Sequence, residues 1–136
     1  MFEITEQDIS KDDLTSVIRK WSNITGKDAH FYHVTTNDRA TRIRVTGLYP
    51  ERTLQIYPRG KILFYERSGV AKWIDKVSQY LLQQDNAEMP KISIVRFKKS
   101  MVRLFYKDKM STRNSMTDTY YVTDPIKIGN NTTLSV

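Results

Sequence analysis

The sequence contains no cysteine and only two histidines, and this excludes two common classes of site. Without thiols there is no disulfide framework and no thiolate metal ligand. Two histidines alone do not complete a zinc site of the usual kind, so we expect no metal. No apolar run approaches the roughly 20 residues that cross a bilayer, and residues 1–10 lack the features of a signal peptide. We therefore expect a cytoplasmic protein without a membrane partner.

Glycine and proline are also scarce, at five and four residues, and the chain has no low-complexity segment or internal repeat. A length of 136 residues favours one domain with one hydrophobic core. Hydrophobic residues make up 39% of the chain, which is enough to form that core. We predict a single domain over residues 1–136, in which residues 1–28 are an N-terminal helical segment.

The net charge of +7 is unevenly distributed. Residues 1–28 carry a net charge of −2, whereas residues 91–113 hold eight basic side chains and one acidic one. Such a cluster can attract nucleic acid, nucleotide phosphates or an acidic protein surface, and it can equally be a solvated strand pair. The residues that we predict to bind an acidic partner are Lys98, Lys99, Arg103, Lys107 and Lys109.

Helical spacing of apolar residues is clearest in two stretches, residues 10–26 and residues 67–84. A shorter helix is predicted over residues 37–46, with Gly47 as its C-terminal stop. The apolar positions are Leu14, Val17, Ile18 and Trp21 in the first helix and Val70, Trp73, Ile74, Val77, Tyr80 and Leu81 in the last.

The remaining stretches rich in β-branched and aromatic residues are predicted to be strands. Helices come first and strands dominate the second half, an order that predicts an α+β fold with a mostly antiparallel sheet. Residues 51–60 and 108–117 are predicted loops, the second of them mobile. The predicted strands cover residues 29–36, 61–66, 91–99, 101–107, 119–128 and 132–136.

One histidine, His33, stands inside an apolar strand and is followed two residues later by Thr35. A short helix, the tetrapeptide GLYP, the stretch KILFYERSGVAKWI and a late TYYVTDP come next. This succession, over residues 31–128, resembles the ADP-ribosyltransferase fold. Proteins of that family split NAD at the nicotinamide–ribose bond and transfer ADP-ribose to an acceptor. The resemblance implies a split antiparallel sheet, an N-terminal helix, two further helices, and NAD as substrate.

The resemblance implies roles for individual residues on the first two strands. His33 and Thr35 match the His-x-Thr element, in which the histidine hydrogen-bonds the adenosine-side ribose. Backbone groups beside that histidine hold the nicotinamide amide. The second strand aligns either Leu63 or Tyr65 with an aromatic residue that stacks on nicotinamide, and we assign Tyr65 because a ring suits a flat heterocycle.

The last motif departs from the family at its catalytic position. Thr119 stands where the family has a glutamate that stabilises a cationic transition state, and Asp118 precedes it. Threonine can hydrogen-bond but brings no charge. Asp118 reaches the site only through a local bulge, because neighbours on a strand point to opposite faces. We name both residues as catalytic candidates, and whether the protein is an enzyme stays open.

Three functions remain at this point. The first is a mono-ADP-ribosyltransferase that uses NAD to modify a protein or nucleic-acid acceptor. The second is a catalytically inactive protein of the same fold that binds protein or nucleic acid, such as a phage-encoded effector or inhibitor. The third, tRNA 2′-phosphotransfer, ranks last because that branch carries an additional N-terminal domain for which the chain is too short.

Overall fold

The computed structural model describes residues 2–4, 9–24, 26–84, 91–108 and 119–127. Within these residues the central feature is a six-stranded sheet, in which every neighbouring pair is antiparallel. The strand order is β1-β4-β2-β3-β6-β5. The strands are β1 (Glu3–Ile4), β2 (His30–Thr36), β3 (Ile62–Tyr65), β4 (Ile92–Lys98), β5 (Tyr106–Lys107) and β6 (Thr119–Val122).

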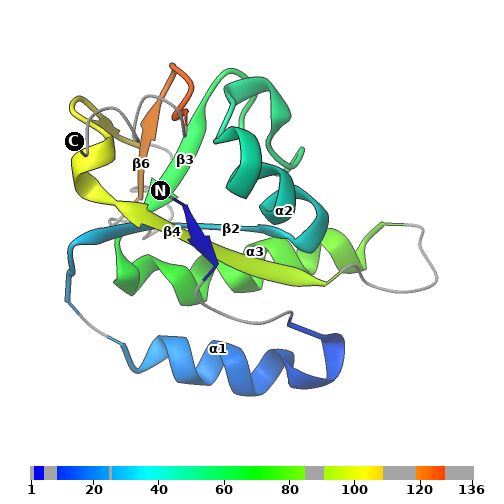
Figure 1. Cartoon of the computed structure of the whole chain (residues 1–136). Coiled ribbons are helices and arrows are strands. Elements are labelled where there is room, and N and C mark those ends of the chain that lie inside the picture. The colour runs from blue at the N-terminus through cyan, green and yellow to red at the C-terminus, as the bar shows by residue number, and fades with distance from the viewer. Residues whose placement is uncertain (1, 5–8, 25, 85–90, 109–118, 128–136) are drawn as a thin grey trace.

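The sheet is split between β2 and β3. Strand β2 pairs with β4 along its whole length, and β3 pairs with β6 along its whole length. Between β2 and β3, however, the register holds only the pair Tyr32–Tyr65 among the described residues. Figure 1 shows the result, with β2 and β4 running in a clearly different direction from β3 and β6. The backbone of β2 beyond Tyr32 therefore lacks a strand partner on its β3 side.

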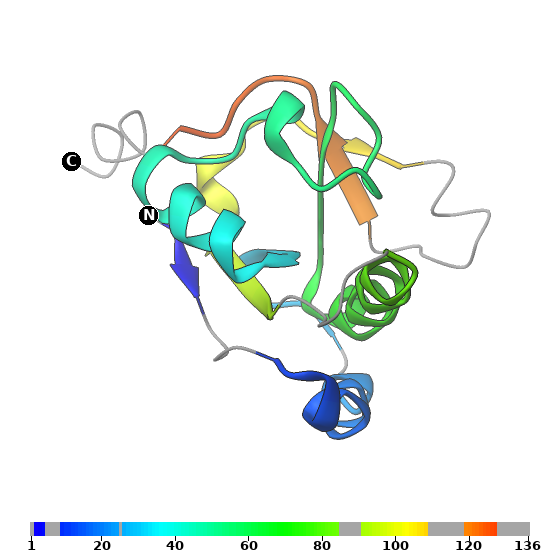
Figure 2. The same cartoon turned by 90° about the vertical axis from the view of Figure 1, so that its right-hand side faces the viewer.

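Three α-helices cover the sheet: α1 (Leu14–Ser22), α2 (Asn37–Thr46) and α3 (Val70–Leu82). Helix α3 lies against one face, α1 packs on the outside of α3, and α2 lies against the opposite face (Figures 1 and 2). The predicted α+β class with an N-terminal helix and two further helices is confirmed. Among the described residues, none of the helices is long and apolar enough to cross a membrane.

Two hydrophobic cores form because side chains alternate across the sheet. On β2, Tyr32 and Val34 face α3, whereas Phe31 faces α2. On β3, Leu63 packs in the core between the sheet and α3, which we call the α3 core, and Phe64 packs in the core on the α2 side. Burial of each such large apolar side chain contributes about 1.5 to 3 kcal/mol. The amphipathic spacing predicted for α1 and α3 is confirmed, since their apolar residues pack into the α3 core.

Three predicted strands differ from the structure or lie outside the described residues. The strand predicted over residues 119–128 is found only from Thr119 to Val122. The strand prediction for residues 101–107 is wrong over most of its length, because residues Lys99–Met101 form a short 3-10 helix and only Tyr106–Lys107 pair with β6. Apolar alternation makes a strand only where a partner lies opposite, and Leu104 is instead 69% exposed. Strand β1 was not predicted, and residues 132–136 lie outside the described part.

Candidate functional site

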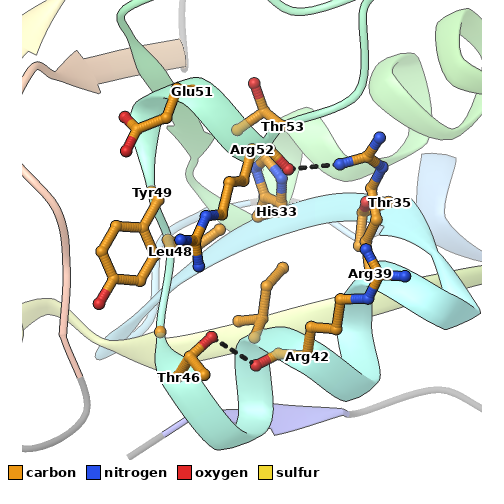
Figure 3. Close-up of a pocket in the computed structure, with 12 residues that line it drawn as sticks. His33, Thr35, Arg39, Arg42, Thr46, Leu48, Tyr49, Glu51, Arg52 and Thr53 are labelled. Atoms are coloured by element: carbon orange, nitrogen blue, oxygen red, sulfur yellow. Dashed lines mark hydrogen bonds between the residues drawn. The ribbon is translucent and has the colours of Figure 1, made fainter.

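A cavity lies between the α2 face of β2 and the chain that follows α2 (Figure 3). Its volume is about 300 Å³, the low end of the range for small-molecule sites. We call it the His33 cavity. It is lined by His33 and Thr35 from β2, Arg39, Arg42, Ile43 and Thr46 from α2, and Gly47, Leu48, Tyr49, Glu51, Arg52 and Thr53.

His33 is buried at the inner end of this cavity and is held in one tautomer. Its Nδ1 lies 2.7 Å from the backbone oxygen of Leu63. A carbonyl can only accept, so Nδ1 carries the proton and donates, which leaves Nε2 as an acceptor. Burial lowers the pKa of His33 to about 4, against a smaller raising effect of the Leu63 carbonyl. At neutral pH His33 can therefore accept a hydrogen bond from a ligand hydroxyl.

Thr35 carries an unpaired hydroxyl on the same wall. It points to the His33 side of β2, because residues two apart on a strand share a face. The residue is fully buried, and its Oγ1 has no hydrogen-bond partner among the described residues. Burying a hydroxyl without a partner costs about 1 to 3 kcal/mol. This hydroxyl is free to form a hydrogen bond with a molecule that enters the cavity.

The outer part of the cavity is strongly basic. Arg39 and Arg42 come from one face of α2, and Arg52 comes from the chain opposite (Figure 3). With Glu51, the lining holds three arginines against one carboxylate, a net formal charge of +2 when His33 is neutral. Arg39 donates from Nη1 to the backbone oxygen of Arg52 at 2.5 Å, and the Arg52 guanidinium lies 4.7 Å from the ring centroid of Tyr49. These two contacts fix the positions of the Arg39 and Arg52 guanidinium groups.

Gly47 ends α2 at the edge of the cavity because no other residue fits there. Its φ is +96°, and a Cβ at this position would lie 2.3 Å from the backbone oxygen of Ile126. The next residue, Leu48, makes a two-way backbone bridge to Ile126. This bridge ties the cavity wall to the chain that follows β6.

Tyr65, the predicted nicotinamide-stacking residue, is fully buried and does not line the His33 cavity. Its ring stacks on Trp73 with centroids 5.4 Å apart and planes 8° apart. Its hydroxyl accepts from the backbone N–H of Val34 and lies 3.0 Å from the hydroxyl of Tyr57. The structure therefore brings His33 and Thr35 together and places Tyr65 on the other face of the sheet.

Thr119 is also buried and already has a partner. Its Oγ1 accepts a hydrogen bond from the indole Nε1 of Trp73 at 2.9 Å. Thr119 lies opposite Tyr65 in the β3–β6 register and does not line the His33 cavity. Asp118 lies outside the described residues.

The predicted basic cluster does not contribute to this cavity. Lys98 ends β4, and the ammonium of Lys99 pairs with the buried Glu66 at 2.6 Å. Arg103 lies before β5 and Lys107 lies on it, and both side chains are exposed. Lys109 lies outside the described residues. The four described members of the cluster, Lys98, Lys99, Arg103 and Lys107, are not among the residues that line the His33 cavity.

Sequence reasoning missed four residues of this region: Arg39, Arg42, Arg52 and Tyr57. The spacing of Arg39 and Arg42 could have indicated from the sequence that both side chains lie on one side of the helix, because residues three apart on a helix share a face. For Arg52 and Tyr57 no local pattern was available, since both lie between α2 and β3. No group of three or more metal-ligating side chains occurs in the described part of the chain.

The sequence matches no protein-family model, no curated protein and no solved structure.

Proposed function

We propose that this protein binds a phosphate-bearing nucleotide in the His33 cavity, with NAD as the first ligand to test. The unpaired hydroxyl of Thr35 carries the proposal, because a buried polar atom facing a cavity gains about 1 to 3 kcal/mol when a ligand satisfies it. The basic outer lining adds the preference for an anion. Together they favour a ligand with hydroxyl groups at one end and negative charge at the other.

A nucleotide meets these requirements with its own parts. Its ribose hydroxyls match the inner wall, where Nε2 of His33 accepts and the hydroxyl of Thr35 donates or accepts. Its phosphates match the guanidinium groups of Arg39, Arg42 and Arg52, which bind phosphate through paired N–H donors. A volume of about 300 Å³ suits part of a dinucleotide rather than all of it.

The resemblance to ADP-ribosyltransferases extends the proposal to transfer of ADP-ribose onto a protein or nucleic-acid acceptor. Two observations favour the alternative, a binding protein without this activity. Thr119 is uncharged and accepts from Trp73, so it brings no carboxylate to the site. Tyr65 is buried with its hydroxyl engaged by Val34 and Tyr57. We therefore place binding first, and propose that an acidic partner meets the exposed basic residues, Lys98, Arg103 and Lys107.

Titration calorimetry with ADP-ribose and NAD tests the binding proposal. We expect Arg42→Gln to weaken ADP-ribose binding about tenfold or more, because it removes a charge-assisted hydrogen bond. Arg44→Gln is the matched control, since Arg44 is exposed on the same helix and does not line the cavity. Equal affinities of these two variants, or no wild-type binding at millimolar ligand, would contradict the proposal.

Thr35 and its neighbour on β2 provide a second matched pair. Thr35→Val should weaken ADP-ribose binding about fivefold, because the ligand loses one hydrogen bond. Thr36→Val should leave the affinity unchanged, because Thr36 points to the other face and does not line the cavity. Release of free nicotinamide from NAD, followed in the same samples, separates a transferase from a binding protein.

A further inference from the structure

Three consecutive large apolar side chains are exposed where the chain enters β5. Leu104 is 69% exposed, Phe105 is 37% exposed and Tyr106 is 48% exposed. Single exposed apolar residues are common on protein surfaces, but contiguous apolar patches mark sites of interaction. Strand β5 is the last in the order of the sheet, so this apolar run lies at one edge of the sheet. The run is therefore a candidate for contact with another molecule.

The ring of Phe105 holds this run in place. It packs edge-on against the rings of Phe31 and Tyr120, with centroids 5.1 Å and 5.2 Å away. It also lies 6.0 Å from the ring of Phe64. Phe31 and Phe64 are buried in the core on the α2 side, so Phe105 joins the run to the interior. A partner that binds beside Phe105 meets a surface that is already ordered, which lowers the entropy cost of binding.

A groove of about 260 Å³ lies beside the apolar run, and we call it the β5 groove. It is lined by residues 101–104 and 106 and by residues 122–126, which follow the start of β6. Among its lining residues, Val122 and Ile126 are buried, and Met101 and Val102 are half-buried. The largely exposed Leu104 also lines it. Buried and exposed apolar side chains together suit a large apolar side chain from a partner.

The two segments around the β5 groove carry a net positive charge. Residues 101–107 contain Arg103 and Lys107, and residues 122–127 contain Lys127 and Asp124, which gives three positive charges against one negative charge. All four side chains are exposed, and Arg103 and Asp124 line the groove itself. An apolar groove with a basic surround is complementary to an apolar side chain with acidic neighbours.

We propose that the β5 groove binds a segment of a partner protein in which large apolar side chains are flanked by acidic residues. The apolar side chains contact Leu104 and the groove, and the flanking carboxylates meet Arg103 and Lys107. The proposal rests on the acidic partner of the proposed function and specifies its class. It does not rest on nucleotide binding, because no residue that lines the His33 cavity also lines the β5 groove.

A single-stranded nucleic acid fits this surface less well than a protein segment does. Its bases would stack on exposed rings, for which the surface offers Tyr106 beside Tyr121, with ring centroids 5.5 Å apart. Stacking on these rings makes no use of the exposed Leu104 or of the buried apolar residues in the groove. A protein segment uses the apolar residues and the basic residues together.

Fluorescence polarisation with a labelled synthetic peptide tests the proposal on the full-length protein. The probe has a central pair of leucines flanked on both sides by aspartates. One matched peptide has serines in place of the leucines, and another has asparagines in place of the aspartates. We expect each matched peptide to bind at least about tenfold more weakly than the probe. No binding of the probe at millimolar concentration, or equal binding of the probe and the serine peptide, overturns the proposal.

Two pairs of surface variants locate the binding site. Leu104→Ser should weaken probe binding about tenfold, whereas Val45→Ser should not change it. Val45 is a matched control, because it is also 69% exposed and lies on α2 outside the groove. Arg103→Gln should weaken binding about threefold and reduce its salt dependence, and Arg44→Gln on α2 should do neither. Equal affinities of Leu104→Ser and Val45→Ser refute the groove as the site.

Two further ligands separate this proposal from its alternatives. An oligothymidylate with the same net charge as the probe tests for nucleic acid. If it binds more tightly than the probe and is insensitive to Leu104→Ser, the protein partner is refuted. ADP-ribose should bind Leu104→Ser as tightly as wild type, because Leu104 does not line the His33 cavity. Failure of wild type to bind ADP-ribose refutes the nucleotide site, whereas the probe results alone decide the β5 groove.

Discussion

Replacing Tyr65 with phenylalanine should destabilise the protein even though the ring and its packing stay. The hydroxyl accepts from the buried N–H of Val34 and donates to Tyr57. Without it the N–H of Val34 has no partner, because β3 does not pair with β2 at this position. An unsatisfied buried N–H costs about 1 to 3 kcal/mol, and a lost hydroxyl pair about 1 kcal/mol. We expect Tyr65→Phe to lower the free energy of unfolding by about 3 kcal/mol.

A double-mutant cycle with Tyr57→Phe isolates the bond between the two hydroxyls. Tyr57→Phe alone should cost about 1 to 2 kcal/mol, because the oxygen of Val34 loses a donor. The double variant should cost less than the sum of the single variants by about 1 kcal/mol, since both single changes remove the same bond.

Urea unfolding followed by circular dichroism measures these differences, provided that the m-value is unchanged. Tyr80→Phe is the matched control, because the Tyr80 hydroxyl is near the surface and makes one long contact of 3.3 Å with Gln55. It should change stability by less than about 0.5 kcal/mol. Two results would refute the hydrogen bonds that link Tyr57, Tyr65 and the backbone of Val34. One is a Tyr65→Phe variant as stable as Tyr80→Phe, and the other is a double variant whose cost equals the sum of the two single costs.

Three further predictions address the cavity itself. Burial lowers the pKa of His33 from 6.5 to about 4, so the unfolded chain protonates first as pH falls. The free energy of unfolding should therefore be highest above pH 6.5 and fall by up to about 3 kcal/mol as the pH drops to 4. Urea titrations of His33→Gln should not show this pH-dependent loss. Thr35→Val should raise the free energy of unfolding by about 1 kcal/mol, because it removes an unpaired buried hydroxyl; a loss of stability would contradict that reading. Gly47→Ala should lower the free energy of unfolding by about 2 kcal/mol or more, and with it the melting temperature, because a Cβ would collide with Ile126. Gly60→Ala is its control, with a φ of +79° but open space around it, so it should cost clearly less.

Much of the architecture followed from local patterns. Helices α1 and α3 were predictable because their apolar residues repeat with helical spacing, and β2, β3 and β4 because β-branched and aromatic runs are bounded by turn residues. Residues 101–107 show where this reasoning stops. They have the composition of a strand, but only Tyr106–Lys107 find a partner. Pairing is a property of two segments, and a single segment does not contain it.

The sequence by itself determined which side chains share a face of each element. Alternation along β2 puts His33 and Thr35 on the same side, and the spacing on α2 does the same for Arg39 and Arg42. Only the tertiary structure decided that these two faces meet across one cavity, and that Arg52 joins them from the connecting chain. The physical reason is that contacts between distant segments depend on how the helices and the sheet pack, which local periodicity does not encode.

The role of Tyr57 was decided by the tertiary structure alone. In the sequence it is one aromatic residue in a predicted loop, without periodicity or motif. In the fold it stacks between His33 and Trp73 and satisfies the backbone of Val34. It does so because the split between β2 and β3 leaves that backbone without a strand partner. Buried polar groups require partners, and here the connecting segment is the part of the chain that reaches them.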